Sequence, residues 1–127
     1  MKKIIPYGRQ SIDQSDIKIV STALKQNLIT TGQYVKIFEK KTTKFLKTKY
    51  TLSCNSGTSA LHLSFCAAGL KKNDTIVMPA INFIAAYNIA SNLGAKIFLA
   101  DVDSKTGQMT PETLLRCINK FKLNKIK

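Results

Sequence analysis

The second half of the chain alternates short β-rich segments with largely apolar helical segments. The predicted strands are residues 50–54, 75–78 and 96–100, and the predicted helices are residues 60–68, about 82–93 and 111–121. Strands that alternate with helices in this way pair in parallel, and a parallel sheet needs helices on both of its faces. We therefore expect an α/β fold in which a parallel-rich sheet is flanked by helices. The helix at residues 60–68 is apolar nearly all round, so we expect it to be buried.

The first part of the chain, residues 1–49, contains two predicted amphipathic helices and no strong strand. The first helix is predicted at residues 13–27, with Asp13 as its N-cap. The second is predicted at residues 34–47, with lysines on the face opposite its apolar residues. We interpret residues 1–49 as an amino-terminal helical segment and residues 50–127 as the first βα units of a larger domain.

The chain ends directly after the last predicted helix. Its 127 residues correspond to one domain at most, or to part of one. In a chain that alternates strands and helices, the next element would be another strand. A parallel sheet usually has more than three strands. We therefore expect the sheet to be incomplete and the chain to be truncated.

The chain is strongly basic, with 20 Lys and Arg against 7 Asp and Glu and a net charge of +13. All of the basic residues except Arg9 and Arg116 are lysines. Sites that recognise nucleic acids favour Arg, because its guanidinium is planar. Lysines spaced along one helix face are typical of a solvent-exposed surface. We therefore expect no nucleic-acid partner.

Composition also bears on compartment and metal binding. No stretch approaches the roughly 18–20 apolar residues of a membrane span, and the first residues lack the apolar run of a signal peptide. The spacing of the 3 Cys matches no zinc site, and their odd number does not favour a disulfide framework. We expect a reduced cytoplasmic protein without a membrane segment and, with His62 as its single histidine, without a metal site.

The strongest local feature is the polar turn at residues 54–60, between a predicted strand and a predicted helix. Free backbone N–H groups, the helix dipole and the hydroxyls of Ser56, Thr58 and Ser59 could together bind a phosphate group. Equally, Ser56 or Thr58 could merely cap the helix. The turn is neither a P-loop nor a dinucleotide-binding turn, because it lacks a Gly-Lys-Ser/Thr triplet and a Gly-x-Gly-x-x-Gly pattern.

A second feature is Phe83, which follows the predicted strand at residues 75–78. Ligands of parallel sheets lie beyond the carboxyl ends of the strands, so this loop and the polar turn would face a common crevice. The ring of Phe83 could then lie on a planar cofactor. The alternative is that Phe83 is an aromatic residue of the core.

Five segments, in this order, resemble the DegT/DnrJ/EryC1/StrS sugar aminotransferase family. They are Ile-Pro-Tyr-Gly-Arg-Gln at residues 5–10, Leu-Ile-Thr-Thr-Gly at 28–32, Asn-Ser-Gly-Thr-Ser-Ala-Leu-His at 55–62, Met-Pro-Ala-Ile-Asn-Phe at 78–83 and Asp-Val-Asp at 101–103. The resemblance covers essentially the whole chain but only the amino-terminal part of such an enzyme. Within the family, the motifs are most similar to the branch that makes a pseudaminic acid precursor.

This resemblance implies the large domain of the fold type I, or aspartate aminotransferase-like, architecture, with pyridoxal 5′-phosphate (PLP) as cofactor. It implies that Gly57 and Thr58 hold the PLP phosphate and that Phe83 stacks on the pyridine ring. The sugar-nucleotide contacts that it implies are Tyr7, Asn27, Leu28, Ile29, Thr30 and Gly57. On the local pattern alone, Tyr7 is equally a packing residue.

The resemblance further implies a homodimer that transfers an amino group from glutamate to a UDP-linked keto-sugar in amino-sugar biosynthesis. In the family, the Schiff-base lysine and the acid that pairs with the pyridine nitrogen lie downstream of the aligned residues. The lysines of this chain occupy helix faces or termini instead of a desolvated pocket. We therefore expect the chain alone to be catalytically incomplete; the alternative is a non-catalytic remnant that binds phosphate-bearing ligands.

Overall fold

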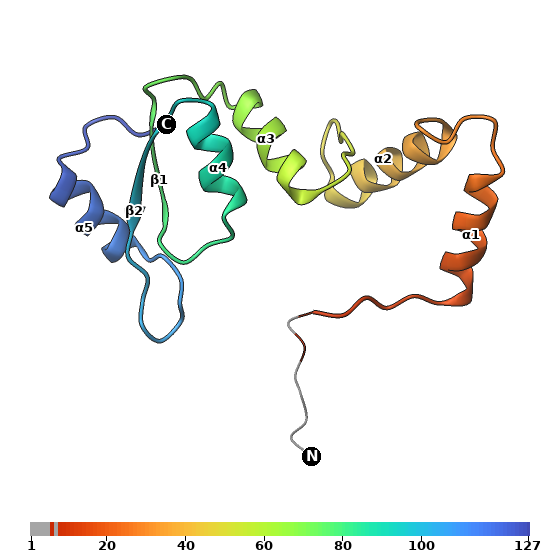
Figure 1. Cartoon of the computed structure of the whole chain (residues 1–127), viewed down its shortest axis with the longest axis horizontal. Helices are drawn as coiled ribbons and strands as arrows, with labels where there is room; N and C mark the ends of the chain where they lie inside the picture. The colour runs from red at the N-terminus through yellow and green to blue at the C-terminus, as the bar shows by residue number, and fades with distance from the viewer. Residues whose placement is uncertain (1–5, 7) are drawn as a thin grey trace, which may run out of the picture. The chain divides into compact units, whose positions relative to one another are not determined.

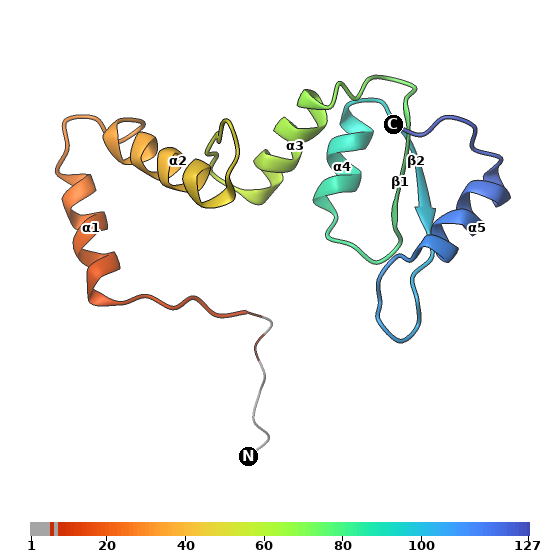
Figure 2. The same ribbon diagram turned by 180° about the vertical axis from the view of Figure 1, so that it is seen from behind.

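The computed structural model describes residue 6 and residues 8–127, and Figures 1 and 2 show the chain from two opposite sides. The chain divides into two compact units, residues 1–53 and 54–127. Tyr7, for which a sugar-nucleotide contact is expected, lies outside the described residues. The longest described helix has 14 residues, and none of the described helices is long and apolar enough to cross a bilayer.

The first helix of the amino-terminal unit is α1 (Gln14–Leu24). Its predicted N-cap is confirmed, because the Asp13 carboxylate accepts the N–H groups of Ser15 and Asp16 at 2.7 and 3.1 Å. The Asp16 carboxylate accepts the Asp13 N–H in return at 3.0 Å, which completes a capping box. The helix ends earlier than predicted, because the N–H groups of Lys25 and Gln26 bond to carbonyls three residues back.

The second helix of this unit is α2 (Gln33–Leu46), which confirms the helix predicted at residues 34–47. It begins after Gly32, whose φ of +124° is a conformation that glycine adopts readily. It ends at Lys47, which is in the left-handed region. Neither α1 nor α2 buries a residue.

The strand predicted at residues 50–54 is wrong, because these residues form no strand. A strand needs a partner to accept and donate its backbone hydrogen bonds. Here the N–H of Ser53 donates to the carboxylate of Glu39 instead, at 2.9 Å. The hydroxyl of Thr43 donates to that of Thr51 at 2.8 Å, so the segment after α2 bonds to side chains of α2.

The carboxy-terminal unit is an α/β arrangement, as predicted. Its elements in chain order are α3 (Gly57–Ala67), β1 (Thr75–Pro79), α4 (Ala85–Asn92), β2 (Lys96–Ala100) and α5 (Pro111–Phe121). The two strands pair in parallel, with Thr75 opposite Lys96 and Pro79 opposite Ala100. Figures 1 and 2 show α4 and α5 on opposite sides of this two-stranded sheet.

The core of this unit lies between the sheet and the helices α3 and α4. Leu70, Met78 and Ala90 form its buried cluster, and Ile97 of β2 packs against them. Phe98, the next residue, contacts Phe121 of α5 with ring centroids 5.1 Å apart. Successive side chains of β2 therefore point to opposite faces of the sheet, as expected for a pleated strand.

Two predictions about the helices of this unit need correction. We expected α3 to be buried because it is apolar nearly all round, but none of its residues is buried, and Leu61 and Leu63 are 37% and 45% exposed. The helix packs on α4, which covers only one of its sides. Helix α4 begins at Ala85 and not near Asn82. The Asn82 side-chain oxygen accepts the Phe83 N–H, a local hydrogen bond that competes with helix formation.

The predicted ends of α4 and α5 are confirmed, because α4 ends at Asn92 with Leu93 as its C-cap and α5 ends at Phe121. Gly94, directly after α4, has a φ of +76°, and a Cβ atom there would lie 3.0 Å from Cγ of Lys72, so only glycine fits without strain. After α5, residues 122–127 form no strand. The Lys127 N–H donates to the Thr75 carbonyl at 2.8 Å, on β1.

Candidate functional site

The polar turn before α3 is held by side-chain hydrogen bonds. Ser56 has an extended backbone, and its Oγ accepts the N–H of Ser59 at 3.1 Å. The hydroxyl of Ser59 donates to the Asn55 side-chain oxygen at 2.7 Å. Of the two residues that the sequence offers as helix caps, Ser56 therefore takes this role and Thr58 does not.

Gly57 and Thr58 are the first two residues of α3, and the cap leaves their N–H groups free of intrahelical partners. The first backbone bond of the helix runs from the N–H of Ala60 to the Ser56 carbonyl, at 3.0 Å. A Cβ atom on Gly57 would meet no heavy atom within 4 Å, so the space above this residue is open. An anion can therefore approach two N–H groups at the positive end of an 11-residue helix.

Phe83 lies in the loop between β1 and α4 and is 73% exposed. The structure thus decides against the core position that the sequence left open. Its backbone is held in place, because its N–H donates to the Asn82 side-chain oxygen at 2.8 Å. One face of the aromatic ring is available to a planar ligand.

A cavity of about 360 Å³ lies between α3, β1 and α4. Its lining includes Leu61 and Phe65 from α3, Met78 from β1 and the amide of Asn82. Gly57, Thr58 and Phe83 are not among the residues that line it, so the structure does not bring these three predicted residues into this cavity. Sequence reasoning missed Asn82 as a lining residue, although a polar side chain just beyond the carboxyl end of a strand is a signal for one.

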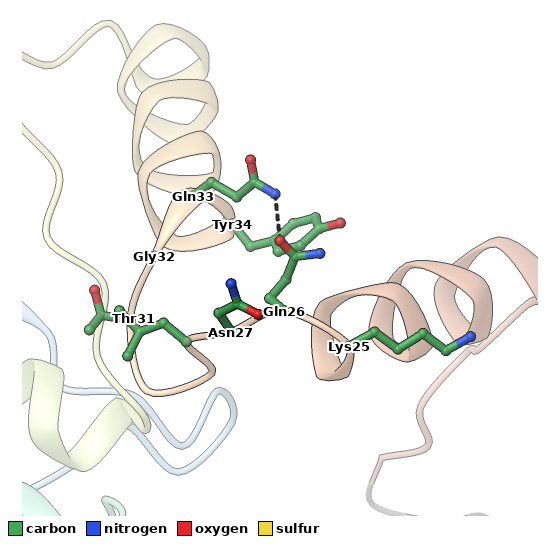
Figure 3. Close-up of a pocket in the computed structure, with 8 residues that line it drawn as sticks. Lys25, Gln26, Asn27, Thr31, Gly32, Gln33 and Tyr34 are labelled. Atoms are coloured by element: carbon green, nitrogen blue, oxygen red, sulfur yellow. Dashed lines mark hydrogen bonds between the residues drawn. The ribbon is translucent and has the colours of Figure 1, made fainter.

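The loop between α1 and α2 forms a second pocket, of about 290 Å³, within the amino-terminal unit (Figure 3). Of the four loop residues with expected substrate contacts, Asn27 and Leu28 line this pocket, whereas Ile29 and Thr30 do not. The pocket also has lining residues for which no ligand contact was expected from the sequence. They are Lys25, Gln26, Thr31, Gly32, Gln33 and Tyr34.

The described lysines lie on the surface, and Asp103 lies in a polar loop. Every lysine among residues 8–127 is exposed, so none of them is desolvated as a reactive amine would need to be. The pKa of Asp103 is lowered by hydrogen bonds from the N–H and hydroxyl of Thr106 and from the N–H of Lys105. Asp103 is therefore a turn-forming carboxylate, as its position in a polar loop predicts.

Solved structures place the fold of this chain among aminotransferase-like enzymes. An aminotransferase from Psychrobacter cryohalolentis matches with a TM-score of 0.76 at 30% identity, over 88% of this chain and 29% of that one. A GDP-4-keto-6-deoxy-D-mannose-3-dehydratase from E. coli, with bound hydrated PLP, matches with a TM-score of 0.79 at 27% identity, over 87% of this chain and 30% of that one.

The chain belongs to the DegT/DnrJ/EryC1/StrS aminotransferase family, whose model matches residues 10–125. The UDP-4-amino-4,6-dideoxy-N-acetyl-beta-L-altrosamine transaminase of Campylobacter jejuni is 38% identical to it over 99 residues. The matched segment is 78% of this chain and 26% of that enzyme, so the chain spans about a quarter of the length of this relative. The family and fold class that the sequence motifs predict are confirmed.

Proposed function

We propose that this chain is the amino-terminal, ligand-contacting part of a PLP-dependent aminotransferase. The complete enzyme transfers an amino group from glutamate to a keto-sugar nucleotide, in the synthesis of pseudaminic acid-like or surface-polysaccharide sugars. The observation that carries this proposal is the open turn at the start of α3, where the N–H groups of Gly57 and Thr58 remain available beyond the Ser56 cap. Similarity to a UDP-sugar transaminase supports the substrate class.

Gly57 and Thr58 fit the phosphate of PLP. Both N–H groups can donate to phosphate oxygens, the Thr58 hydroxyl adds a third donor, and the helix dipole favours the negative charge. The open space over Gly57 lets a phosphate come close to the backbone. The exposed ring of Phe83 supplies a face for the pyridine ring.

PLP, when bound, supplies an electron sink for the reacting carbon, and the protein supplies binding and orientation. In this proposal Tyr7 and the loop residues Asn27, Leu28, Ile29 and Thr30 contact the sugar nucleotide. The pocket that Asn27 and Leu28 line supports this assignment. The complete enzyme is a homodimer.

The residues described here contain no lysine suited to a covalent bond with the cofactor, because every lysine among residues 8–127 is exposed. We therefore assign to this chain the recognition of the cofactor phosphate and of the sugar nucleotide. In this proposal, proton transfer and the covalent cofactor bond belong to residues other than the described lysines.

Equilibrium dialysis of the 127-residue chain against PLP tests the proposal. We expect saturable binding that depends on the phosphate, so that pyridoxal binds much more weakly. The Gly57→Val variant should lose this binding, because its side chain fills the space over the turn. Ser64→Ala, on the same helix, is the matched control and should bind as the unchanged chain does.

Two results would contradict the proposal. One is equal binding of PLP and pyridoxal, which would remove the phosphate from the recognition. The other is a stoichiometric lysine adduct after borohydride reduction of the PLP-treated chain, which would show that the chain carries its own reactive amine.

A further inference from the structure

A chain of side-chain hydrogen bonds spans Gly57 and Thr58 at the start of α3. The hydroxyl of Ser59 donates to Oδ1 of Asn55 at 2.7 Å, and Oγ of Ser59 lies 3.0 Å from Oγ of Ser56. Oγ of Ser56 also accepts the N–H of Ser59 at 3.1 Å. These bonds close a loop over residues 55–59, with Gly57 and Thr58 in the middle of it.

The direction of each hydrogen in this chain follows from the chemistry of its acceptor. Oδ1 of Asn55 carries no hydrogen, so the single hydroxyl hydrogen of Ser59 points to Asn55. In the bond between Ser59 and Ser56, the hydrogen therefore comes from Ser56. Both serine hydroxyls thus donate within the turn and present only lone pairs to a ligand.

This arrangement decides which groups a phosphate meets at the start of α3. The sequence offers the hydroxyls of Ser56, Thr58 and Ser59, but a phosphate needs donors, and the two serines have none left. Among the described residues of the turn, the hydroxyl of Thr58 and the N–H groups of Gly57 and Thr58 remain as donors. A set of donors that is fixed before the ligand arrives loses less conformational entropy on binding.

We propose that Asn55 is a positioning residue of the cofactor phosphate site, an assignment that rests on the proposed function for the site itself. Its side-chain oxygen orients the hydroxyl of Ser59, which in turn orients that of Ser56. This chain holds the backbone of Gly57 and Thr58 in the conformation that presents their N–H groups. An amide suits this role better than a carboxylate, because it supplies an acceptor without a negative charge beside the phosphate.

A double-mutant cycle tests whether Asn55 acts through Ser59. Equilibrium dialysis measures the PLP affinity of the 127-residue chain in Asn55→Ala, in Ser59→Ala and in the double variant. Each single variant should weaken binding about two-fold to ten-fold, because the turn loses its fixed conformation. The double variant should bind no more weakly than the weaker of the two, because both changes break the same chain. Ser59→Thr keeps the hydroxyl and should retain the affinity of the unchanged chain.

Asn55→Asp separates the positioning of a phosphate from the stabilisation of the helix. The variant keeps an acceptor for Ser59 and adds a negative charge, which favours the positive end of the α3 dipole but repels a phosphate. It should leave the free energy of unfolding unchanged or raised and weaken PLP binding about five-fold or more. A merely structural role would change stability and binding in the same direction. Asn119→Ala and Asn119→Asp, at an exposed residue of α5, are the matched controls and should leave PLP binding unchanged.

Three outcomes would overturn the inference and leave the proposed function in place. The first is a PLP affinity in Asn55→Ala equal to that of the unchanged chain. The second is additive losses in the double variant, which would show that Asn55 acts independently of Ser59. The third is undiminished PLP binding in Asn55→Asp. Absence of PLP binding by the unchanged chain is distinguishable from all three, because it rejects the proposed function together with this assignment.

Discussion

The carboxylate of Glu39 accepts two hydrogen bonds from Ser53, one from its N–H at 2.9 Å and one from its hydroxyl at 2.8 Å. Glu39 lies on α2, and Ser53 lies in the segment for which the sequence predicts a strand. The Glu39 carboxylate thus accepts a hydrogen bond from the Ser53 N–H, which in a sheet would donate to a neighbouring strand instead. Together with the hydrogen bond between Thr43 and Thr51, this contact holds the segment after α2 against that helix.

Replacement of Glu39 by alanine should release the segment after α2. The variant leaves the N–H and hydroxyl of Ser53 without their shared acceptor, so hydrogen exchange at the Ser53 amide should become faster. Glu39→Gln keeps an acceptor oxygen and should retain more of the protection. NMR-detected hydrogen exchange measures both, and unchanged exchange at Ser53 in Glu39→Ala would refute the role of this contact.

The same contact should depend on pH. Hydrogen bonds from the Ser53 N–H and, to a smaller extent, from its hydroxyl lower the pKa of Glu39, because they favour the charged carboxylate. The folded-state pKa therefore lies below the unfolded value of about 4.3, and the contact is fully present above that pH and is lost as the pH falls through the folded pKa. A carboxyl-carbon NMR titration measures the shift. Ser53→Ala should bring the pKa of Glu39 only part of the way back, since the N–H remains, and an unchanged pKa would be contrary to this account.

The start of α5 was predictable because its determinants are local. The triplet Thr-Pro-Glu at residues 110–112 predicts an N-cap, a proline in the first turn and an acidic first turn, and the structure has all three. The Oγ1 atom of Thr110 accepts the N–H of Thr113, three residues on. Such contacts can be predicted, because the residues that make them lie close together in the sequence.

The absence of a strand at residues 50–54 and the exposure of α3 were not predictable in the same way. A run such as Tyr-Thr-Leu-Ser-Cys has strand propensity, but whether it forms a strand depends on a partner elsewhere in the molecule. An apolar helix such as α3 likewise buries only the faces that other elements cover, and here the element that α3 contacts most is α4. Both failures come from interactions that are remote in sequence.

One part of the candidate site was likewise predictable from local sequence, and another part was not. The start of α3 at Gly57 and Thr58 was predictable, because small polar residues before an apolar run have the pattern of a helix N-terminus, although the strand expected before them does not form. The hydrogen bond between the side-chain amides of Gln26 and Gln33 was not, since the two residues are seven apart and come together only when the loop between α1 and α2 closes. Glutamines on either side of a glycine-containing loop were the available signal.

Removal of the Thr58 hydroxyl should weaken PLP binding. A hydrogen bond to a charged phosphate typically contributes about 1.5–3 kcal/mol, so Thr58→Ala should raise the dissociation constant by about 10-fold to 150-fold. Ser64→Ala is the control, because its hydroxyl donates to the Ala60 carbonyl within α3, at 2.8 Å. Equilibrium dialysis measures both, and equal PLP affinity in the two variants would remove Thr58 from the phosphate site.

The buried hydroxyl of Thr113 should stabilise α5. Thr113 is 2% exposed, and its Oγ1 accepts the Thr110 N–H at 2.9 Å and donates to the Thr110 carbonyl at 3.1 Å. Thr113→Val keeps the shape but leaves a partly buried N–H unpaired, so it should lower the free energy of unfolding by about 1–3 kcal/mol. Thr110→Ser keeps the cap and should cost much less. Urea unfolding compares them, and a valine variant as stable as the unchanged chain would show that this pair contributes nothing.

The two aromatic residues Phe83 and Phe98 should respond in opposite ways to replacement by alanine. Phe83 is 73% exposed, so Phe83→Ala should change the free energy of unfolding by less than about 0.5 kcal/mol and should weaken PLP binding by removing the stacking face. Phe98 is half-buried and packs on Phe121 at 5.1 Å, so Phe98→Ala should cost about 2 kcal/mol or more of stability. Thermal unfolding and PLP dialysis of both variants separate the two roles. If Phe83→Ala destabilises the fold as much as Phe98→Ala and leaves PLP affinity unchanged, Phe83 is a packing residue and the stacking assignment fails.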